Sequence, residues 1–550
     1  MSEQSKKQSF LGGAAILAGA VAVVKVIGAL YKLPLNNILG DVGKTYFQTA
    51  YEIYNVLLTV STAGLPLAIS KLTSQAHARG RENEKRKIFR AAIWLFFALG
   101  LIGSCLMFFG AQGLADFQRN SMAAAPIRAL APAVFCVCLL ACMRGYTQGQ
   151  GNMGPTAVSQ VLEALCKLGV GLPLAWYILK KTQEAGNAAQ LAAGSDGMEN
   201  VAAGAIFGVT VGTILSMVFL ILYLLRHRDN TPSDDVPRSG GYLLRRILAI
   251  GVPITLGNCA MSIITMIDTK IILGRLQSGL GLTEVAASAL KGQYSSAMDM
   301  LNMVASFVYP VTMSLIPFAA AALAQGDKRG ASRTVNSAFR VLALLALPAG
   351  VGLSVLSTPI MVLVLPAQRE GALAAGPHLK ILGIACIFVC LMILTNAILQ
   401  TYGKEHLPIF TVIVGGVVKI VMNYILVGNP NIGINGAPWS TLCCYGVIAG
   451  LNLFFVWKYS PRKPHYFRLF ARPVFASALM GLAAWAVCSL VSKLLSGHSA
   501  YGANAIATLC GILAGVAVYG VLAIALGLLR ADDVRNIRGG QKLIRLLHLR

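Results

Sequence analysis

The sequence predicts an all-α integral membrane protein with about 14 transmembrane helices. We expect two six-helix lobes related by a pseudo-two-fold axis along the membrane normal, plus two extra C-terminal helices. Hydrophobic residues make up 56% of the 550 residues and charged residues only 12%, about half the share in an average soluble domain. Apolar stretches of about 20 residues, the length that crosses a bilayer, alternate with short basic clusters. The two halves of the chain also resemble each other.

Fourteen apolar segments are the candidate spans. Lys6 and Lys7 precede the first, which continues to Leu30 and is therefore longer than the apolar region of a signal peptide, about 7–15 residues. We therefore expect this first span to be retained. The expected spans are residues 10–31, 46–69, 91–113, 127–146, 155–177, 201–225, 247–274, 289–323, 335–364, 378–401, 408–427, 436–458, 474–495 and 503–529.

The distribution of Lys and Arg predicts the orientation. With the N-terminus inside, 30 of the 46 Lys and Arg lie on the inner side and 11 on the outer side. Because cytoplasmic loops carry the excess of basic residues, we expect a multi-pass protein of the plasma (inner) membrane with both termini cytoplasmic. The net charge of +25 does not indicate nucleic-acid binding, because the basic residues form no continuous face on a folded domain.

A weak internal repeat supports two lobes. Residues 50–55 (AYEIYN) resemble residues 297–302 (AMDMLN), and Lys167 and Lys419 stand at similar offsets within spans 5 and 11. Six spans separate the equivalent elements, so the two halves are parallel repeats. The predicted parts are an N-lobe with spans 1–6 (1–230), a C-lobe with spans 7–12 (231–460), and spans 13–14 with a basic cytoplasmic tail (461–550).

Ionisable residues within spans are the candidate functional residues. Each costs about 2.5–3.5 kcal/mol at the centre of the bilayer, so it must pair, reach the interface or line a hydrated cavity. The basic ones are Lys25, Arg144, Lys167, Lys270 and Lys419, and the acidic ones are Glu52, Glu163, Asp268 and Asp299.

The outer half of the first span carries the first candidate site. Lys25 either extends to the outer surface or faces a hydrated cavity and binds an anionic group such as a phosphate, and we favour the cavity. For Lys32, at the end of this span, the two alternatives are balanced. Glu52 in span 2 could pair with Lys25 or line the cavity, and Asp299 is its counterpart in the second half.

Span 5 and span 11 differ in their local charges. Glu163 precedes Lys167 by one helical turn, a spacing at which the two charges neutralise each other. Lys419 has no such local partner. With Asn423 and with Asp268 of span 7, Lys419 could form an ion-coupling or gating site, or a buried ion pair.

The remaining span features have structural interpretations. Arg144, at the inner end of span 4, is expected to anchor the helix at the interface, and Lys270 to extend to the outer surface. Gly204, Gly208 and Gly212 repeat every four residues in span 6, a spacing that lets helix backbones approach closely.

No catalytic, nucleotide-binding or metal-binding motif is evident in the sequence. The segment 43–45 (GKT) resembles the end of a P-loop, but Ile38 stands where that motif requires glycine, and the segment falls in an expected outer loop. H-E-x-x-H, G-x-S-x-G and C-x-x-C patterns are absent. We therefore expect a transporter and not an enzyme, with no nucleotide, nucleic acid, metal or cofactor.

The first two spans carry several distinctive motifs: residues 25–28 (KVIG), 31–35 (YKLPL), 39–40 (LG), 51–54 (YEIY), 61–66 (STAGLP) and 68–71 (AISK). These motifs resemble the stage V sporulation protein B family, which includes the MurJ-type lipid II flippases of Gram-positive bacteria. Residues 419–424 (KIVMNY) resemble the polysaccharide-export branch of the same MATE-like superfamily.

This resemblance implies fourteen helices around a central cavity, alternating access, and a polyprenyl-diphosphate-linked sugar of cell-wall or spore peptidoglycan synthesis as cargo. Lys25 matches the first diphosphate-binding basic residue of the family, and Lys32 matches the second with a shift of one residue. An arginine that Gram-negative members carry on the second helix has no counterpart, because residues 56–59 read VLLT.

Some family members bind sodium with residues of helices 7 and 11. Asp268 and Asn423 lie on these helices, where the ammonium of Lys419 could replace the ion. The expected coupling ion is therefore Na⁺ or H⁺, and the expected partners are a lipid-linked saccharide and membrane lipids, with a monomeric chain. The alternatives are a MATE-like multidrug or cation exporter, a membrane transferase acting on polyprenyl-linked sugars, and a scaffold without transport.

Overall fold

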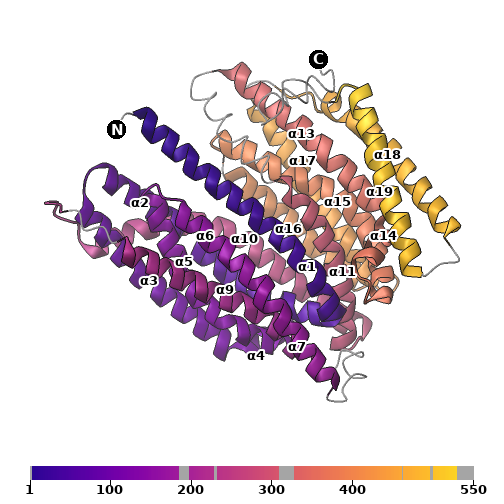
Figure 1. Cartoon of the computed structure of the whole chain (residues 1–550), viewed down its shortest axis with the longest axis horizontal. Coiled ribbons are helices and arrows are strands. Elements are labelled where there is room, and N and C mark those ends of the chain that lie inside the picture. Colours follow the sequence, from indigo (N-terminus) through magenta and orange to yellow (C-terminus); the bar gives the residue numbers. More distant parts are fainter. Residues whose placement is uncertain are drawn as a thin grey trace. The chain divides into compact units, whose positions relative to one another are not determined.

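The computed structural model describes residues 3–184, 197–227, 232–308, 327–404, 406–460, 463–495 and 500–528. In these ranges every regular element is a helix and there is no strand (Figure 1). This confirms the all-α class. The predicted basic tail and residues 309–323 of the eighth expected span lie outside the described residues.

Eleven described helical segments are long and apolar enough to cross a membrane. The first, Gly19–Ala78, covers two of the expected spans. The seventh and eighth expected spans correspond to α10 (Gly240–Leu280) and α11 (Glu284–Ser306), which are not among the eleven. The chain is therefore a multi-pass membrane protein, whereas the count of fourteen stays a prediction.

The chain divides into two compact units, Met1–Gly292 and Gln293–Arg550. The first boundary predicted from the sequence was at residue 230, ahead of span 7. In the structure α10 packs against α1, α2 and α3, so it belongs to the first unit. Apolar surface shared with these helices, and not the position of the linker before α10, sets this boundary.

Helix α1 (Glu3–Thr62) replaces the outer loop that was expected between residues 32 and 45. A straight helix of this length would be about 90 Å long, about three times the hydrocarbon core. Gly40 interrupts it with φ 65° and ψ −178°, a conformation open to glycine because it lacks a Cβ atom. The expectation of a loop was wrong because the chain turns at this single residue and stays helical on both sides.

Helix α5 lies at the centre of the first unit, where it packs against α3, α9, α1 and α2. Its neighbours α6, η2 and α7 form one span that a π-helical turn interrupts from Lys167 to Gly171. The remaining bounds are α2 (Leu65–Ala78), α3 (Glu82–Phe109), α4 (Ala111–Phe117), η1 (Ser121–Ala123), α5 (Ala124–Gly149), α6 (Gly154–Cys166), η2 (Lys167–Gly171), α7 (Leu172–Thr182) and α9 (Met198–Arg226).

The glycine stripe of α9 makes the close helix contact predicted from its spacing. A Cβ atom on Gly208 would lie 2.4 Å from the Cα atom of Gly171, and one on Gly212 would lie 2.9 Å from the carbonyl oxygen of Glu163. Gly204 is similarly close to Ile178. The stripe therefore brings α9 against the span that carries Glu163 and Lys167.

In the second unit α15 and α16 both pack against α17, and α13 packs against α15 and α18. Helices α18 and α19, which correspond to the two extra C-terminal spans, pack against each other. The bounds are α13 (Lys328–Val355), α14 (Ser357–Val364), α15 (Arg369–Thr401), α16 (His406–Val427), η4 (Gly433–Asn435), α17 (Gly436–Tyr459), α18 (Tyr466–Leu494) and α19 (Ala500–Ala525).

Candidate functional site

The first unit contains an ion-pair cluster between α5 and α6. Glu163 Oε1 lies 3.3 Å from Lys167 Nζ, and Glu163 Oε2 lies 3.4 Å from Arg144 Nη2. The Arg144 Nε atom also donates a hydrogen bond of 2.9 Å to the Ser159 hydroxyl. The predicted Glu163–Lys167 pair is confirmed. The assignment of Arg144 as an interface anchor was wrong, because its guanidinium turns inward to a carboxylate on the neighbouring helix.

Lys25 and Lys32 occupy the first half of α1. The side chain of Lys25 is exposed and that of Lys32 is half-buried. They stand seven residues apart, so they lie two turns apart on one helix face. Lys32 is also the charged neighbour that acts electrostatically on Lys25. Two like charges therefore lie close together on a helix that crosses the membrane.

Glu52 lies in a second group of buried charges within the first unit. Its side chain accepts a hydrogen bond of 3.0 Å from Gln48, and Lys291 and Asp268 are the charged neighbours that act on it. Glu52, Asp268 and Lys291 are 5%, 3% and 3% exposed, respectively. The structure thus brings Glu52 and Asp268, which the sequence assigned to separate roles, into one electrostatic neighbourhood.

The sequence analysis did not select Lys291, which lies near the start of the eighth expected span, residues 289–323. It is buried because the start of α11 lies directly against α1. A Cβ atom on Gly292 would lie 1.8 Å from the Asp41 carbonyl oxygen, and the Thr45 hydroxyl donates a hydrogen bond of 2.7 Å to the Ser288 carbonyl. The run of small residues in 286–292 (AASALKG) is the signal that could have indicated this close approach.

The remaining predicted residues lie in the second unit. Asn423 is fully buried in α16, and its Oδ1 accepts a hydrogen bond of 2.5 Å from the Ser440 hydroxyl of α17. Lys419, one turn earlier on α16, is half-buried, as is Asp299 on α11. Asp268, the third member of the predicted coupling site, belongs to the first unit.

A chain of neutral polar groups connects three helices of the second unit. The Thr411 hydroxyl of α16 donates to Asn452 Oδ1 of α17 at 2.8 Å, and Asn452 Nδ2 donates to Asn396 Oδ1 of α15 at 2.8 Å. Thr411 and Asn452 are fully buried. The sequence analysis did not select these residues, because a single uncharged polar residue within an apolar span does not show whether it contacts another helix.

Membrane-crossing helices that retain charged and polar groups in their interior are typical of membrane transport proteins. The chain belongs to the polysaccharide biosynthesis protein family, whose model matches residues 10–322. The MatE family model matches residues 253–425. The resemblance to the stage V sporulation protein B and MurJ family that the sequence indicated is therefore confirmed.

Three relatives from Bacillus subtilis (strain 168) match nearly the whole chain. The uncharacterized membrane protein YabM is 26% identical, with 98% of this chain and 96% of the relative covered. Stage V sporulation protein B is 24% identical (96% and 98% covered). Lipid II flippase MurJ is also 24% identical (96% and 97% covered).

Solved structures show the same fold. Lipid II flippase MurJ in its inward closed conformation superposes with a TM-score of 0.65 at 14% identity, covering 93% of this chain and 99% of that one. An inward-facing multidrug resistance MATE family transporter gives a TM-score of 0.59 at 15% identity, covering 82% and 98%. The chain is a membrane transporter with the MurJ and MATE-like fold.

Proposed function

We propose that this transporter is a flippase that moves a polyprenyl-diphosphate-linked saccharide, lipid II or a related cell-envelope precursor, across the plasma membrane. The observation that carries the proposal is the pair Lys25 and Lys32 on one face of α1. Two neighbouring ammonium groups attract anionic groups, and a diphosphate supplies two negative groups that both lysines can contact.

In the proposed cycle the head group is bound by Lys25 and Lys32 from the cytoplasmic side and released outside by alternating access, while the polyprenyl tail stays in the bilayer. No nucleotide is consumed. The membrane potential, worth about 2.3 kcal/mol per charge at 100 mV, or a Na⁺ or H⁺ gradient drives transport. Asp268, Asn423, Lys419 and Asp299 are the proposed coupling or gating residues.

The test is complementation of bacteria depleted of their lipid II flippase. We expect the wild-type chain to restore growth, Lys25→Ala at matched expression to fail, and Lys25→Arg to restore growth at least in part because the charge is kept. Lys270→Ala is the matched control, since Lys270 also lies in a span but contacts the Phe117 ring at 3.4 Å. Equal rescue by Lys25→Ala and wild type would refute the role of Lys25.

An organic-cation exporter is the second candidate. The match to the MatE family and the buried carboxylates of Glu52 and Asp268 favour it, since acidic cavities suit cationic cargo. Efflux of a fluorescent cation by the reconstituted protein, with no movement of labelled lipid II, would favour the exporter. A membrane transferase would instead convert the labelled lipid into a new product.

A further inference from the structure

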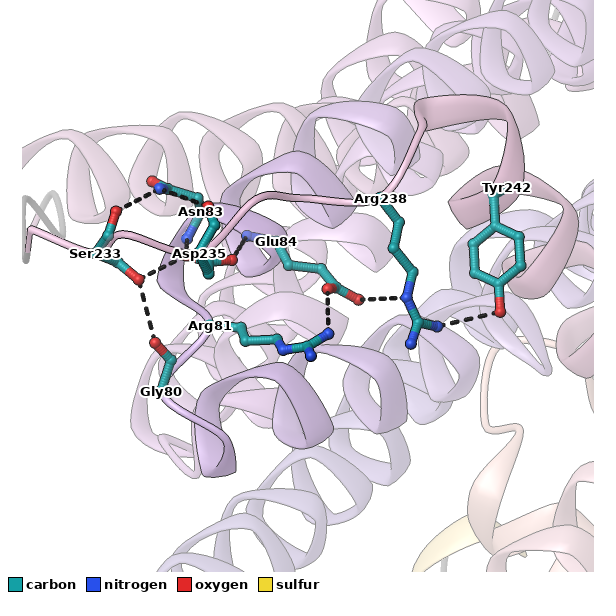
Figure 2. Close-up of polar contacts among 8 residues, drawn as sticks. All are labelled: Gly80, Arg81, Asn83, Glu84, Ser233, Asp235, Arg238 and Tyr242. Atoms are coloured by element: carbon teal, nitrogen blue, oxygen red, sulfur yellow. Dashed lines mark hydrogen bonds and ion pairs between the residues drawn. The ribbon is translucent and has the colours of Figure 1, made fainter.

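The linker ahead of α10 is fixed to the start of α3 by a polar cluster (Figure 2). Asp235 accepts hydrogen bonds of 2.9 Å from the backbone N–H groups of Asn83 and Glu84. The Asn83 amide donates to the Ser233 carbonyl at 2.6 Å, and the Ser233 hydroxyl donates to the Gly80 carbonyl at 3.2 Å. These contacts hold the following linker residues against the side of α3.

A groove with a volume of about 620 Å³ lies between this linker and α3. One face of α3 forms most of it, because its lining residues follow the three- and four-residue spacing of a helix face. Pro237 and Gly240 close it from the linker side. The α3 residues that line the groove are Asn83, Arg86, Lys87, Arg90, Ala91 and Trp94.

The described lining of the groove is cationic, with three basic side chains and no carboxylate. The nearby acidic groups face other partners. Glu82 pairs with Lys85 and with His77. Glu84 lies 3.2 Å from Arg81 and 4.0 Å from Arg238. The positive charge of Arg86, Lys87 and Arg90 is therefore concentrated on the groove.

The order of residues along α3 places the groove at the membrane depth expected for a lipid head group. The basic residues end at Arg90, and the apolar part of α3 begins at Ala91. Trp94, the groove residue that lies furthest into the apolar part, is 67% exposed, and exposed tryptophans are enriched at the boundary between head groups and acyl chains. The basic residues are on the side that the positive-inside rule assigns to the cytoplasm.

We propose that this groove binds the head group of an anionic phospholipid of the inner leaflet. Arg86, Lys87 and Arg90 contact the phosphate, and Trp94 packs along the start of the acyl chains. Basic pockets at the cytoplasmic ends of transmembrane helices recognise such head groups. Because linker residues form one wall, the bound lipid also stabilises the linker against α3.

The test uses the full-length protein in a neutral detergent and native mass spectrometry with phosphatidylglycerol and phosphatidylcholine. The groove variant is Arg86→Gln/Lys87→Gln/Arg90→Gln, and the matched control is Arg226→Gln/Arg245→Gln/Arg246→Gln, which removes the same charge outside the groove. We expect the groove variant to lose about tenfold or more in affinity for phosphatidylglycerol, the control to stay within about twofold, and phosphatidylcholine to bind weakly to all three proteins.

Two competition experiments distinguish a phospholipid head group from other ligands that carry phosphate. Inorganic phosphate that displaces phosphatidylglycerol at equal concentration would overturn the lipid proposal. Undecaprenyl diphosphate that binds far more tightly than phosphatidylglycerol would make the groove a cargo site and would also overturn it. Equal losses of phosphatidylglycerol affinity in the groove variant and the control would show a general effect of charge and would contradict a specific site. If the triple variant does not fold, the exposed single change Arg90→Gln still has to weaken phosphatidylglycerol binding measurably.

Discussion

The two units hold helices together with different chemistry. In the first unit Glu163 of α6 binds Arg144 and Lys167, and Ser159 completes the cluster. In the second unit Asn452 of α17 joins α16 and α15 through neutral hydrogen bonds. An internal charge cluster needs every member, because a lone buried charge is costly, whereas the loss of one neutral hydrogen bond costs less. We therefore expect the first unit to be more sensitive to substitution at this junction.

Removal of the shared carboxylate should have the largest effect. We expect Glu163→Gln to lower the free energy of unfolding by about 3–5 kcal/mol, because it leaves Arg144 and Lys167 without their counter-charge. The midpoint of thermal unfolding in detergent reports this loss of stability. Glu184→Gln is the matched control, since Glu184 forms an i,i+4 pair with Lys180 in which both side chains are more than half exposed, and such pairs contribute about 0–1 kcal/mol. Equal shifts in the two variants would contradict the proposed cost of the buried cluster.

The close contact beside this cluster should give the next largest effect. We expect Gly208→Ala to cost about 3 kcal/mol, because the new methyl group would meet the backbone of Gly171 and force the helices apart. Gly169→Ala, where nothing lies within 4 Å of the added Cβ, should leave the thermal midpoint nearly unchanged. Because alanine is the better helix former, a destabilisation by Gly169→Ala as large as that by Gly208→Ala would show that the close contact with Gly171 does not set the response.

A smaller effect is expected at the neutral junction of the second unit. Asn452→Ala removes both of its helix-to-helix hydrogen bonds and should cost about 1–3 kcal/mol. The comparison with Glu163→Gln in one thermal unfolding series measures the contrast between the two units. Asn431→Ala, at an exposed position, is the control. A loss at Asn452 that exceeds the loss at Glu163 would reverse the ranking of the two junctions.

Helix α3 of the first unit and helix α13 of the second unit differ in how their N-termini are capped. In α13 Asp327 accepts a hydrogen bond of 2.8 Å from Gly330 within the same turn. In α3 the cap is Asp235, which comes from the distant linker. Partial removal from water acts to raise the pKa of Asp235, but hydrogen bonds from Ser233 and from the Asn83 and Glu84 backbones outweigh it and lower this pKa.

The smallest predicted effect concerns pH and this distant cap. Because the pKa of Asp235 is lowered in the folded state, its stabilisation is complete above the ordinary aspartate pKa and is lost as the pH falls through the lowered value. We expect the hydrogen-exchange protection of residues 232–239, taken relative to the intrinsic exchange rate at each pH, to fall over this acidic range in the wild type. Asp235→Ala should show fast exchange already at neutral pH, whereas the exposed neighbour change Asp234→Ala should behave as the wild type does. Identical exchange in both variants would refute the cap.

Contacts of the candidate site that lie within one helix can be predicted from local sequence, whereas contacts between helices cannot. The Glu163–Lys167 pair follows from a four-residue spacing on one helix, and the glycine stripe of α9 predicts its own close contact. The third member, Arg144, comes from a different helix, so its partner depends on how α5 and α6 pack. Lys44 falls in an expected outer loop and Lys291 near the start of an expected span, and only the contact between α1 and α11 shows that both are buried.

The sequence by itself determined that this chain is a helical membrane protein, because segments of this length and apolarity require a lipid environment, and its motifs indicated the flippase family. Only the tertiary structure decided that α10 packs within the first unit, that Gly40 replaces an expected loop, and that Asp235 caps a helix far from it in the chain. The physical reason is that hydropathy and residue spacing act within one segment, whereas charge pairing, capping and close packing between helices depend on which segments meet.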